Sequence, residues 1–244
     1  MGHIDQYLTA SDLGSILLID KPVGITSFDV IYRLRRWHGV EKAGHAGTLD
    51  PRASGLLIIC IGNETKNIHR FVDLEKEYVG TFQLGIRTPS FDMETEVSER
   101  ADCSGVTLET LEAATGRFLG RQLQTPPMYS AAKHHGKPLY KYARRGQVLE
   151  RTPKEINIRE IAVTAFAPPF VEFRVVCSKG TYIRSLANDI GTVLGCGAAL
   201  TALRRTRIGT YEVGNAVTLE KLEGAKRENE PRDGETNGYR IPAQ

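Results

Sequence analysis

The chain has 244 residues, of which 41% are hydrophobic, enough for one large domain or two modest ones with a real core. The formal net charge of +3 does not mark the whole chain as a strongly basic nucleic-acid-binding protein. No apolar stretch approaches the roughly 18 residues that span a bilayer, and the chain opens without a signal-peptide pattern, so we expect a cytoplasmic protein with no membrane contact.

A strand and a capped helix are expected first. The short apolar run 15–19 predicts a buried strand, and Thr26 is the expected N-cap of a helix over 27–38, with Asp29 as its capping-box partner. Apolar residues recur at helical spacing on one side of this helix, and three arginines fill the other side. These arginines fit either a solvated face or a contact with phosphate groups.

The stretch 43–62, AGHAGTLDPRASGLLIICIG, is the best candidate for chemistry. Pro51 restricts Asp50 to extended backbone angles, and the apolar run 56–61 is long enough for one buried strand. A loop that is fixed in this way can hold a carboxylate in one direction. An Asp before a Pro is also typical of a plain turn, and the stretch alone does not decide between the two.

Periodicity predicts the elements that follow. We expect a short helix over 63–71, a strand over 78–84 from its alternation, and a polar, acidic loop over 87–96. A second helix is expected over 108–115, ended by Gly116.

A basic segment interrupts this pattern. Between 117 and 154, nine Lys or Arg residues stand against one acidic residue, a net charge of +8. Prolines and glycines exclude a continuous helix over 124–151 and predict a long excursion from the core. Its tyrosines and cations interleave, which suits stacking on bases and neutralisation of phosphates, although an ordinary basic loop is the alternative. The interleaved residues are Tyr129, Lys133, Lys137, Tyr140, Lys141, Tyr142, Arg144 and Arg145.

A hairpin and a helix are expected next. The runs 156–166 and 170–177 predict two antiparallel strands, and the motif SKGTYIR then leads into a helical stripe that ends at Gly195. Arg184 lies in the first turn of that helix, where the helix dipole favours carboxylates and not cations. This placement indicates an acidic partner, for which Asp50 is a candidate.

The last part of the chain predicts a strand or edge segment over 200–207 and a short helix over 218–223. From 224 onward the sequence is charged and broken by Pro and Gly, which is typical of disorder. We therefore expect a lead-in over 1–14, one folded domain over 15–223 and a disordered tail over 224–244.

Six segments, in order, resemble the TruB-type family of tRNA pseudouridine synthases. They are LLIDKPVGITS, GHAGTLDPRASGLL with CIGNETK, KEYVG, QTPPMYSAAKHHGKPLYKYAR, CSKGTYIRSLANDIG and GCGAALTALRRTRIG, and they cover roughly residues 15–222. The resemblance implies an α/β fold of the mixed type, with an extended, mostly antiparallel sheet, flanking helices and a central cleft. It also implies an isomerase that converts uridine to pseudouridine at position 55 in the T loop of tRNA, with no cofactor and no metal.

The resemblance also implies roles for individual residues. Asp50 would be the nucleophile or charge stabiliser, Arg184 its partner, and Tyr78 the ring that stacks on the flipped uracil and assists proton transfer. His45 would help the target uridine leave the T-loop stack. The other implied cleft or RNA-contacting residues are Lys21, Lys66, Tyr182 and Leu203, to which we add Tyr129, Lys133, Lys137 and Arg144 of the basic segment.

The partners expected from this resemblance are limited to RNA. We expect a monomer that binds the T stem-loop of tRNA without a guide RNA and without the C-terminal PUA domain that the family usually carries. The main alternative is a non-catalytic RNA-binding or tRNA-folding protein on the same scaffold. A zinc deaminase is a poorer alternative because the chain lacks the H-x-E and P-C-x-x-C ligands.

Overall fold

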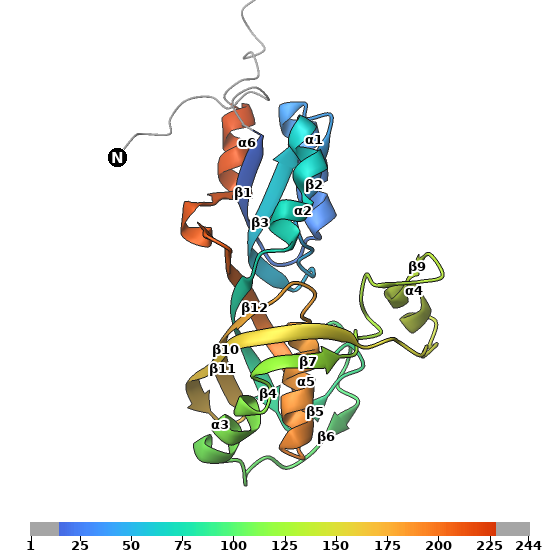
Figure 1. The fold of residues 1–244 in the computed structure, drawn as a ribbon, viewed down its shortest axis with the longest axis vertical. Coiled ribbons are helices and arrows are strands. Elements are labelled where there is room, and N and C mark those ends of the chain that lie inside the picture. Colours follow the sequence, from blue (N-terminus) through green and yellow to red (C-terminus); the bar gives the residue numbers. More distant parts are fainter. Residues whose placement is uncertain (1–14, 228–244) are drawn as a thin grey trace, which may run out of the picture.

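A long mixed sheet runs through the molecule, which the computed structural model describes for residues 15–227 (Figure 1). The strand order is β14-β1-β3-β12-β4-β11-β10-β7, with β2 beside β3 and β13 beside β12. Two pairs, β1 with β14 and β12 with β3, are parallel, and the other pairs are antiparallel. The expected mixed, mostly antiparallel sheet is confirmed. The lead-in 1–14 and the tail over 228–244 lie outside the described residues.

The strands of the long sheet are β1 Ile16–Lys21, β2 Ala43–His45, β3 Ala53–Ile61, β4 Lys76–Leu84, β7 Gly120–Gln124, β10 Lys154–Ala167, β11 Phe170–Cys177, β12 Ala198–Ile208, β13 Tyr211–Glu212 and β14 Val217–Thr218. Two small hairpins lie outside it, β5 Ile86–Arg87 with β6 Glu99–Arg100, and β8 Lys133–His134 with β9 Lys137–Pro138. The helices are α1 Ser27–His38, α2 His69–Val72, α3 Leu108–Gly116, α4 Leu139–Ala143, α5 Ile183–Val193 and α6 Leu219–Arg227, with 3₁₀ turns at η1 Gly62–Asn67 and η2 Val213–Asn215.

Strand β3 is covered on both faces, which explains its unbroken apolar sequence. Leu57 and Ile59 pack with α1 and α6 on one face, whereas Leu56 and Ile58 pack with Phe71 of α2 on the other. All four strand residues are fully buried. The loop that carries Asp50 therefore leads into a strand that is packed on both faces.

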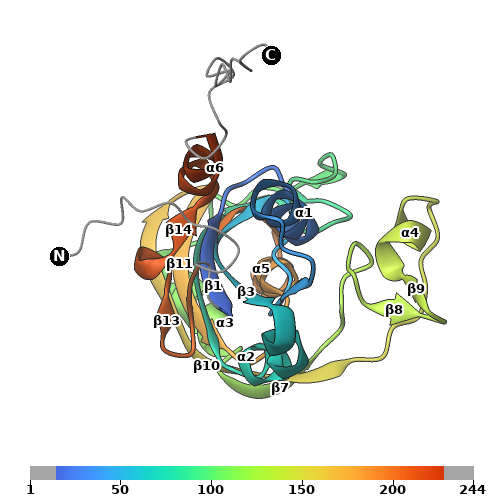
Figure 2. The ribbon, with the colours of Figure 1, turned by 90° about the horizontal axis from the view of Figure 1, so that it is seen from above.

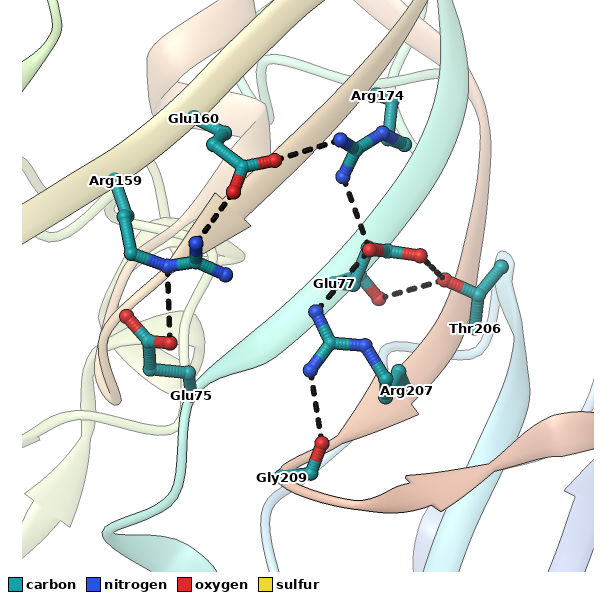
Figure 3. A network of polar contacts seen from close by, with 8 residues as sticks. All are labelled: Glu75, Glu77, Arg159, Glu160, Arg174, Thr206, Arg207 and Gly209. Carbon is teal, nitrogen blue, oxygen red and sulfur yellow. Dashed lines mark hydrogen bonds and ion pairs between the residues drawn. The ribbon is translucent and has the colours of Figure 1, made fainter.

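The lower half of the sheet is covered unequally. One face, with Phe82 of β4 and Phe173 of β11, packs against α5 and α3 in the largest core cluster. The other face carries a chain of half-exposed ion pairs, in which Glu77 accepts from Arg174 at 3.0 Å and from Arg207 at 3.2 Å (Figure 3). These side chains are 20–47% exposed, so each pair contributes little free energy.

Helix α1 forms as expected. The Asp29 backbone N–H donates to Thr26 Oγ1 at 3.0 Å, and the Thr26 backbone N–H donates to the Asp29 carboxylate at 2.8 Å, which completes the capping box. Gly39 ends the helix with φ 62°, a left-handed conformation that suits glycine. The helix over 108–115 and the hairpin of β10 and β11 are also confirmed, with ends that differ by a few residues.

Three expectations were wrong in part. The helix over 63–71 is two pieces, η1 and α2, and neither has a side-chain cap. Residues 200–207 belong to β12, a central strand between β3 and β4, and not to an edge segment. The arginines that suggest an exposed strand do not face water freely, because Arg205 is buried and Arg204 is paired with Asp20. The disordered tail does not begin at 224, since α6 continues to Arg227 and is anchored by buried Leu219 and Leu222.

The basic segment leaves the body of the molecule, as expected. Figures 1 and 2 show β8, β9 and α4 standing apart from the sheet, connected to it at the ends of β7 and β10. Over residues 15–227, no helix is long and apolar enough to cross a membrane.

Candidate active site

The loop that carries Asp50 is tied to the start of α1. Ser27 Oγ accepts from the Leu49 backbone N–H at 2.9 Å and donates to the Leu49 carbonyl oxygen at 3.1 Å. The Gly24 backbone N–H donates to the Pro51 carbonyl oxygen at 2.7 Å. These bonds fix the backbone on both sides of Asp50, in addition to the restriction that Pro51 imposes.

Arg184 is the partner of Asp50. Its Nε lies 2.8 Å from Asp50 Oδ2, while Nη1 donates to the Ser90 carbonyl oxygen and Nη2 to that of Tyr129, both at 2.9 Å. The Arg184 side chain is 4% exposed, and a second carboxylate, that of Asp92, lies 3.6 Å from Nε. The acidic partner predicted from the position of Arg184 at the start of α5 is confirmed.

The pKa of Asp50 is raised above its ordinary value. Burial is the largest cause, Arg184 opposes it, and the negative charges of Asp92 and Glu94 add to the rise. The side chain is nevertheless 41% exposed, because the carboxylate opens into a cleft. The carboxylate is therefore reachable by a substrate although protein surrounds it on its other sides.

The cleft beside Asp50 has a volume of about 360 Å³, in the range of a small-ligand site. Tyr78, which is 8% exposed, and Tyr182 line it together with Lys76 and Arg205. A narrow slot that Asp50 also lines is bounded by Arg52, Asp92, Arg184 and Leu203 and by residues 200–202. Of the predicted residues, Asp50, Arg184, Tyr78, Tyr182 and Leu203 are thus brought together.

Tyr78 lies against Arg205, which the sequence did not single out. Arg205 is 1% exposed, its Nε donates to the Leu56 carbonyl oxygen at 2.7 Å, and its Nη2 donates to the Gly47 carbonyl oxygen at 3.1 Å. Burial raises the pKa of Tyr78, and the positive charge of Arg205 opposes the rise. Gly55 permits this arrangement, since a Cβ there would lie 2.2 Å from the Arg205 carbonyl oxygen.

Two lysines are buried near the same loop. Lys21 is 0% exposed and donates to the carbonyl oxygens of Pro22 and Ile25, both at 2.8 Å. Burial, the largest cause, lowers the pKa of Lys21 to about 8, and burial followed by the charge of Arg205 lowers that of Lys76 to about 8. The ammonium group of Lys21 faces protein carbonyls, which is not the position of a surface RNA contact.

The remaining predicted residues lie away from the cleft lining. His45 is half-buried in β2, where burial and then Arg205 lower its pKa, and Lys66 is exposed on η1. The Gln124 side chain holds the backbone of Tyr182 by two hydrogen bonds, at 2.7 and 3.0 Å. Lys133, Lys137 and Arg144 are exposed on the excursion, and Tyr129 is half-buried at its base. Arg144 forms an ion pair with Glu94 at 3.2 Å.

Sequence reasoning missed three residues of the site, Asp92, Arg205 and Lys76. Asp92 lies in the loop that the sequence showed only as polar and acidic. Arg205 stands in a run of arginines that resembles an exposed edge. No sequence signal distinguishes Asp92 and Arg205 from solvated charges, because Arg184 and the Leu56 carbonyl oxygen, their partners, come from distant parts of the chain. Lys76 donates to carbonyl oxygens of residues 71–74, just before it, and its sequence does not show that it is buried.

Known proteins resemble this chain along most of its length. The family model for the TruB family pseudouridylate synthase N-terminal domain matches residues 35–183, and that for the tRNA pseudouridylate synthase B C-terminal domain matches 184–236. The tRNA pseudouridine synthase B of Burkholderia pseudomallei is 50% identical over 216 residues, which are 88% of this chain and 71% of that protein. The enzyme of the same name from Ralstonia nicotianae is 50% identical over 222 residues, 89% of this chain and 70% of that protein.

One solved structure, a Cbf5-Nop10-Gar1 complex, shares the fold with a TM-score of 0.68 and 31% identity. The match covers 86% of this chain and 53% of the matched chain, so this chain corresponds to about half of that protein.

Proposed function

The chain belongs to the TruB family of pseudouridylate synthases, and we propose that Asp50 and Arg184 form the centre of its reaction. The enzyme is an isomerase that converts uridine to pseudouridine in tRNA. The reaction breaks the bond from uracil N1 to ribose C1′, turns the base and joins C5 to C1′. The proton on C5 is released while N1 gains one, so the reaction needs no oxidant and no co-substrate.

Asp50 is proposed to act on the ribose. Cleavage leaves positive charge at C1′, which a fixed carboxylate stabilises or captures as an ester. Arg184 engages Oδ2, so that Oδ1 remains for the sugar. Because burial favours the neutral acid, the positive charge of Arg184 opposes the rise in the pKa of Asp50 and favours its ionised form.

Tyr78 is proposed to receive the base. A uridine inside a folded RNA loop has to leave its stack before its glycosidic bond can be reached, and an aromatic ring replaces the lost neighbours. Tyr78 presents its side chain to the cleft that Asp50 lines, with Leu203 in the adjoining slot. We assign proton transfer at the base to the Tyr78 hydroxyl and help with the exit of the uridine to His45.

The substrate site is proposed to be position 55 in the T stem-loop. The excursion supplies the grip, because its exposed lysines and its tyrosines stand apart from the body where RNA can reach them. Lys66, exposed on η1, is a further proposed contact. We also propose that the enzyme works as a monomer in the cytoplasm and without a guide RNA.

The observation that carries the proposal is the 2.8 Å pair of Asp50 and Arg184 at the wall of a cleft that also holds Tyr78. The test uses tRNA labelled with tritium at uridine C5. Wild-type enzyme and the control Asp102→Asn, an exposed carboxylate outside the cleft, should release tritium. Asp50→Asn should bind the tRNA and release none. Release by Asp50→Asn at the wild-type rate would show that another group attacks the sugar.

A further inference from the structure

Helix α1 exposes two large aromatic side chains that its packing does not need. Phe28 is 62% exposed and Tyr32 is 58% exposed, although α1 already buries Val30, Ile31 and Leu34 against the sheet and α6. Phe28 and Tyr32 are four residues apart, so they are neighbours on one side of the helix. Exposed apolar side chains gathered on one element mark an interaction surface more often than scattered ones do.

Two arginines continue the same side of the helix. Arg35 and Arg36 follow Phe28 by seven and eight residues, spacings that return to the same face. Both are exposed, and neither forms an ion pair with any residue in the described range 15–227. Arg33, by contrast, lies over the ring of Trp37 at 5.7 Å. We call Phe28, Tyr32, Arg35 and Arg36 the α1 stripe.

The α1 stripe begins beside the catalytic loop. Ser27, the residue before Phe28, holds the backbone of Leu49 on one side of Asp50, and Gly24 holds that of Pro51 on the other. From Phe28 to Arg36 the helix advances about 12 Å, at about 1.5 Å per residue. That length is about three to four stacked nucleotides at about 3.4 Å each. The stripe therefore has about the length of a segment of three to four nucleotides, and it starts at the residue after Ser27, which holds the Asp50 loop.

The chemistry of the stripe favours RNA over a protein partner. Unpaired guanidinium groups attract phosphates, and adjacent aromatic rings stack on bases of any identity. Figure 1 places α1 on the upper half of the molecule, whereas the excursion leaves from the lower half. We propose that the α1 stripe is a second RNA-contacting surface, on which Arg35 and Arg36 neutralise phosphates and Phe28 and Tyr32 stack on exposed bases. This inference rests on the proposed function in that tRNA is the ligand.

The test compares two double variants with a matched control. Arg35→Gln with Arg36→Gln removes two charges, and Phe28→Ala with Tyr32→Ala removes both rings. The control, Leu108→Ala with Arg117→Gln, removes one exposed apolar side chain and one exposed cation from the region of α3. For each protein we would measure affinity for whole tRNA between about 50 and 200 mM salt, tritium release at saturating enzyme, and the circular dichroism melt.

The two double variants should behave differently. Loss of the arginines should weaken binding and reduce the slope of log affinity against log salt by about 1.4 to 1.8, the value for two phosphate contacts. Loss of the rings should weaken binding about tenfold or more and leave the slope unchanged. The release rate at saturation and the melt should match the wild type, as should every property of the control.

Wild-type affinity and slope in both double variants would overturn the inference and make the stripe a solvated face. That result would leave the role of Asp50 intact, provided that the wild type releases tritium. A wild type that releases none, combined with weakened binding in both double variants, would instead overturn the proposed catalytic site and support the second RNA surface.

Discussion

The acidic limb of the pH profile should respond to Asp92, a residue that touches neither base nor sugar in the proposed reaction. Asp92 raises the pKa of Asp50 by its negative charge, and its carboxylate competes for the same Arg184 Nε. Asp92→Asn removes that charge and keeps the size of the side chain. The pKa of Asp50 should therefore fall, and activity should persist to lower pH, because the carboxylate stays ionised further into the acidic range.

The distances around Arg184 set the size of this effect. Asp50 Oδ2 and Asp92 Oδ2 lie 2.8 and 3.6 Å from Arg184 Nε, so these oxygens are no more than about 6.4 Å apart. Two unit charges at that separation repel by about 2.6 kcal/mol at an effective dielectric constant of about 20 and by about 0.6 kcal/mol in bulk water. Divided by about 1.36 kcal/mol for each pH unit, these energies bracket the downward shift of the midpoint of the acidic limb. Because the Asp50 side chain is 41% exposed, we expect a value in the lower half of this range.

Single-turnover tritium release, followed from about pH 4 to pH 8, measures the midpoint of the limb separately from the maximal rate. The midpoint should move down by about half a pH unit to one unit, whatever Asp92→Asn does to the maximum. Asp102→Asn again serves as the control and should leave the midpoint in place. A midpoint that stays at the wild-type pH, or moves up, would refute the electrostatic reasoning and show that Asp50 does not set the limb.

Four further outcomes follow from the contacts. Arg184→Ala should lower the release rate by about 10² to 10³, the typical loss when one group that stabilises charge in an active site is removed, with a much smaller change in tRNA affinity; equal losses in both would contradict its proposed catalytic role. Arg205→Met should slow tritium release and move the alkaline limb of the pH–rate profile to higher pH, because the positive charge that lowers the pKa of Tyr78 is lost. Arg205→Lys should return the limb part of the way to its wild-type position. Lys133→Gln with Lys137→Gln should weaken binding and reduce the salt slope by about 1.4 to 1.8 while the saturated rate holds. The free energy of unfolding should rise between about pH 8 and pH 10, because the pKa values of Lys21 and Lys76 are both lowered to about 8 in the folded state and the unfolded chain therefore binds more protons there. Chemical denaturation of Lys21→Met should show a rise that is smaller than that of the wild type by on the order of 2 kcal/mol.

The fold could be predicted wherever a pattern is local. Thr26 and Asp29 predict the start of α1, and the helical spacing of its apolar residues predicts its buried side. Both features could be predicted because capping and amphipathic packing depend on residues within one or two turns. The position of β12 could not be predicted in this way. Its arginines make the segment resemble a polar edge, and their partners, Asp20 for Arg204 and the Leu56 carbonyl oxygen for Arg205, lie almost 150 residues or more away in sequence.

The same distinction between local patterns and distant partners applies to the residues of the site. Asp50 could be named as a candidate because a Gly-rich loop, a proline and a buried strand adjoin it in sequence, and Arg184 because a cation at a helix start indicates an anionic partner. Asp92 could not be found, since an acidic loop on the surface and an acidic loop folded over an arginine have the same composition. Lys21 shows the opposite failure, because a lysine that suits a nucleic-acid cleft is buried against carbonyl oxygens instead.

Arg184 connects the two activities that the proposed reaction requires. Its guanidinium group contacts the carboxylate of Asp50, the acidic loop at the Ser90 carbonyl oxygen and the base of the excursion at the Tyr129 carbonyl oxygen. A guanidinium group is planar and rigid, so a displacement of one of these three partners changes the geometry of the other two. The segment proposed to grip RNA is therefore mechanically joined to the carboxylate proposed to attack the sugar. A lysine at position 184 would keep the charge but lose this connection, because its ammonium group has no fixed plane in which to hold three partners.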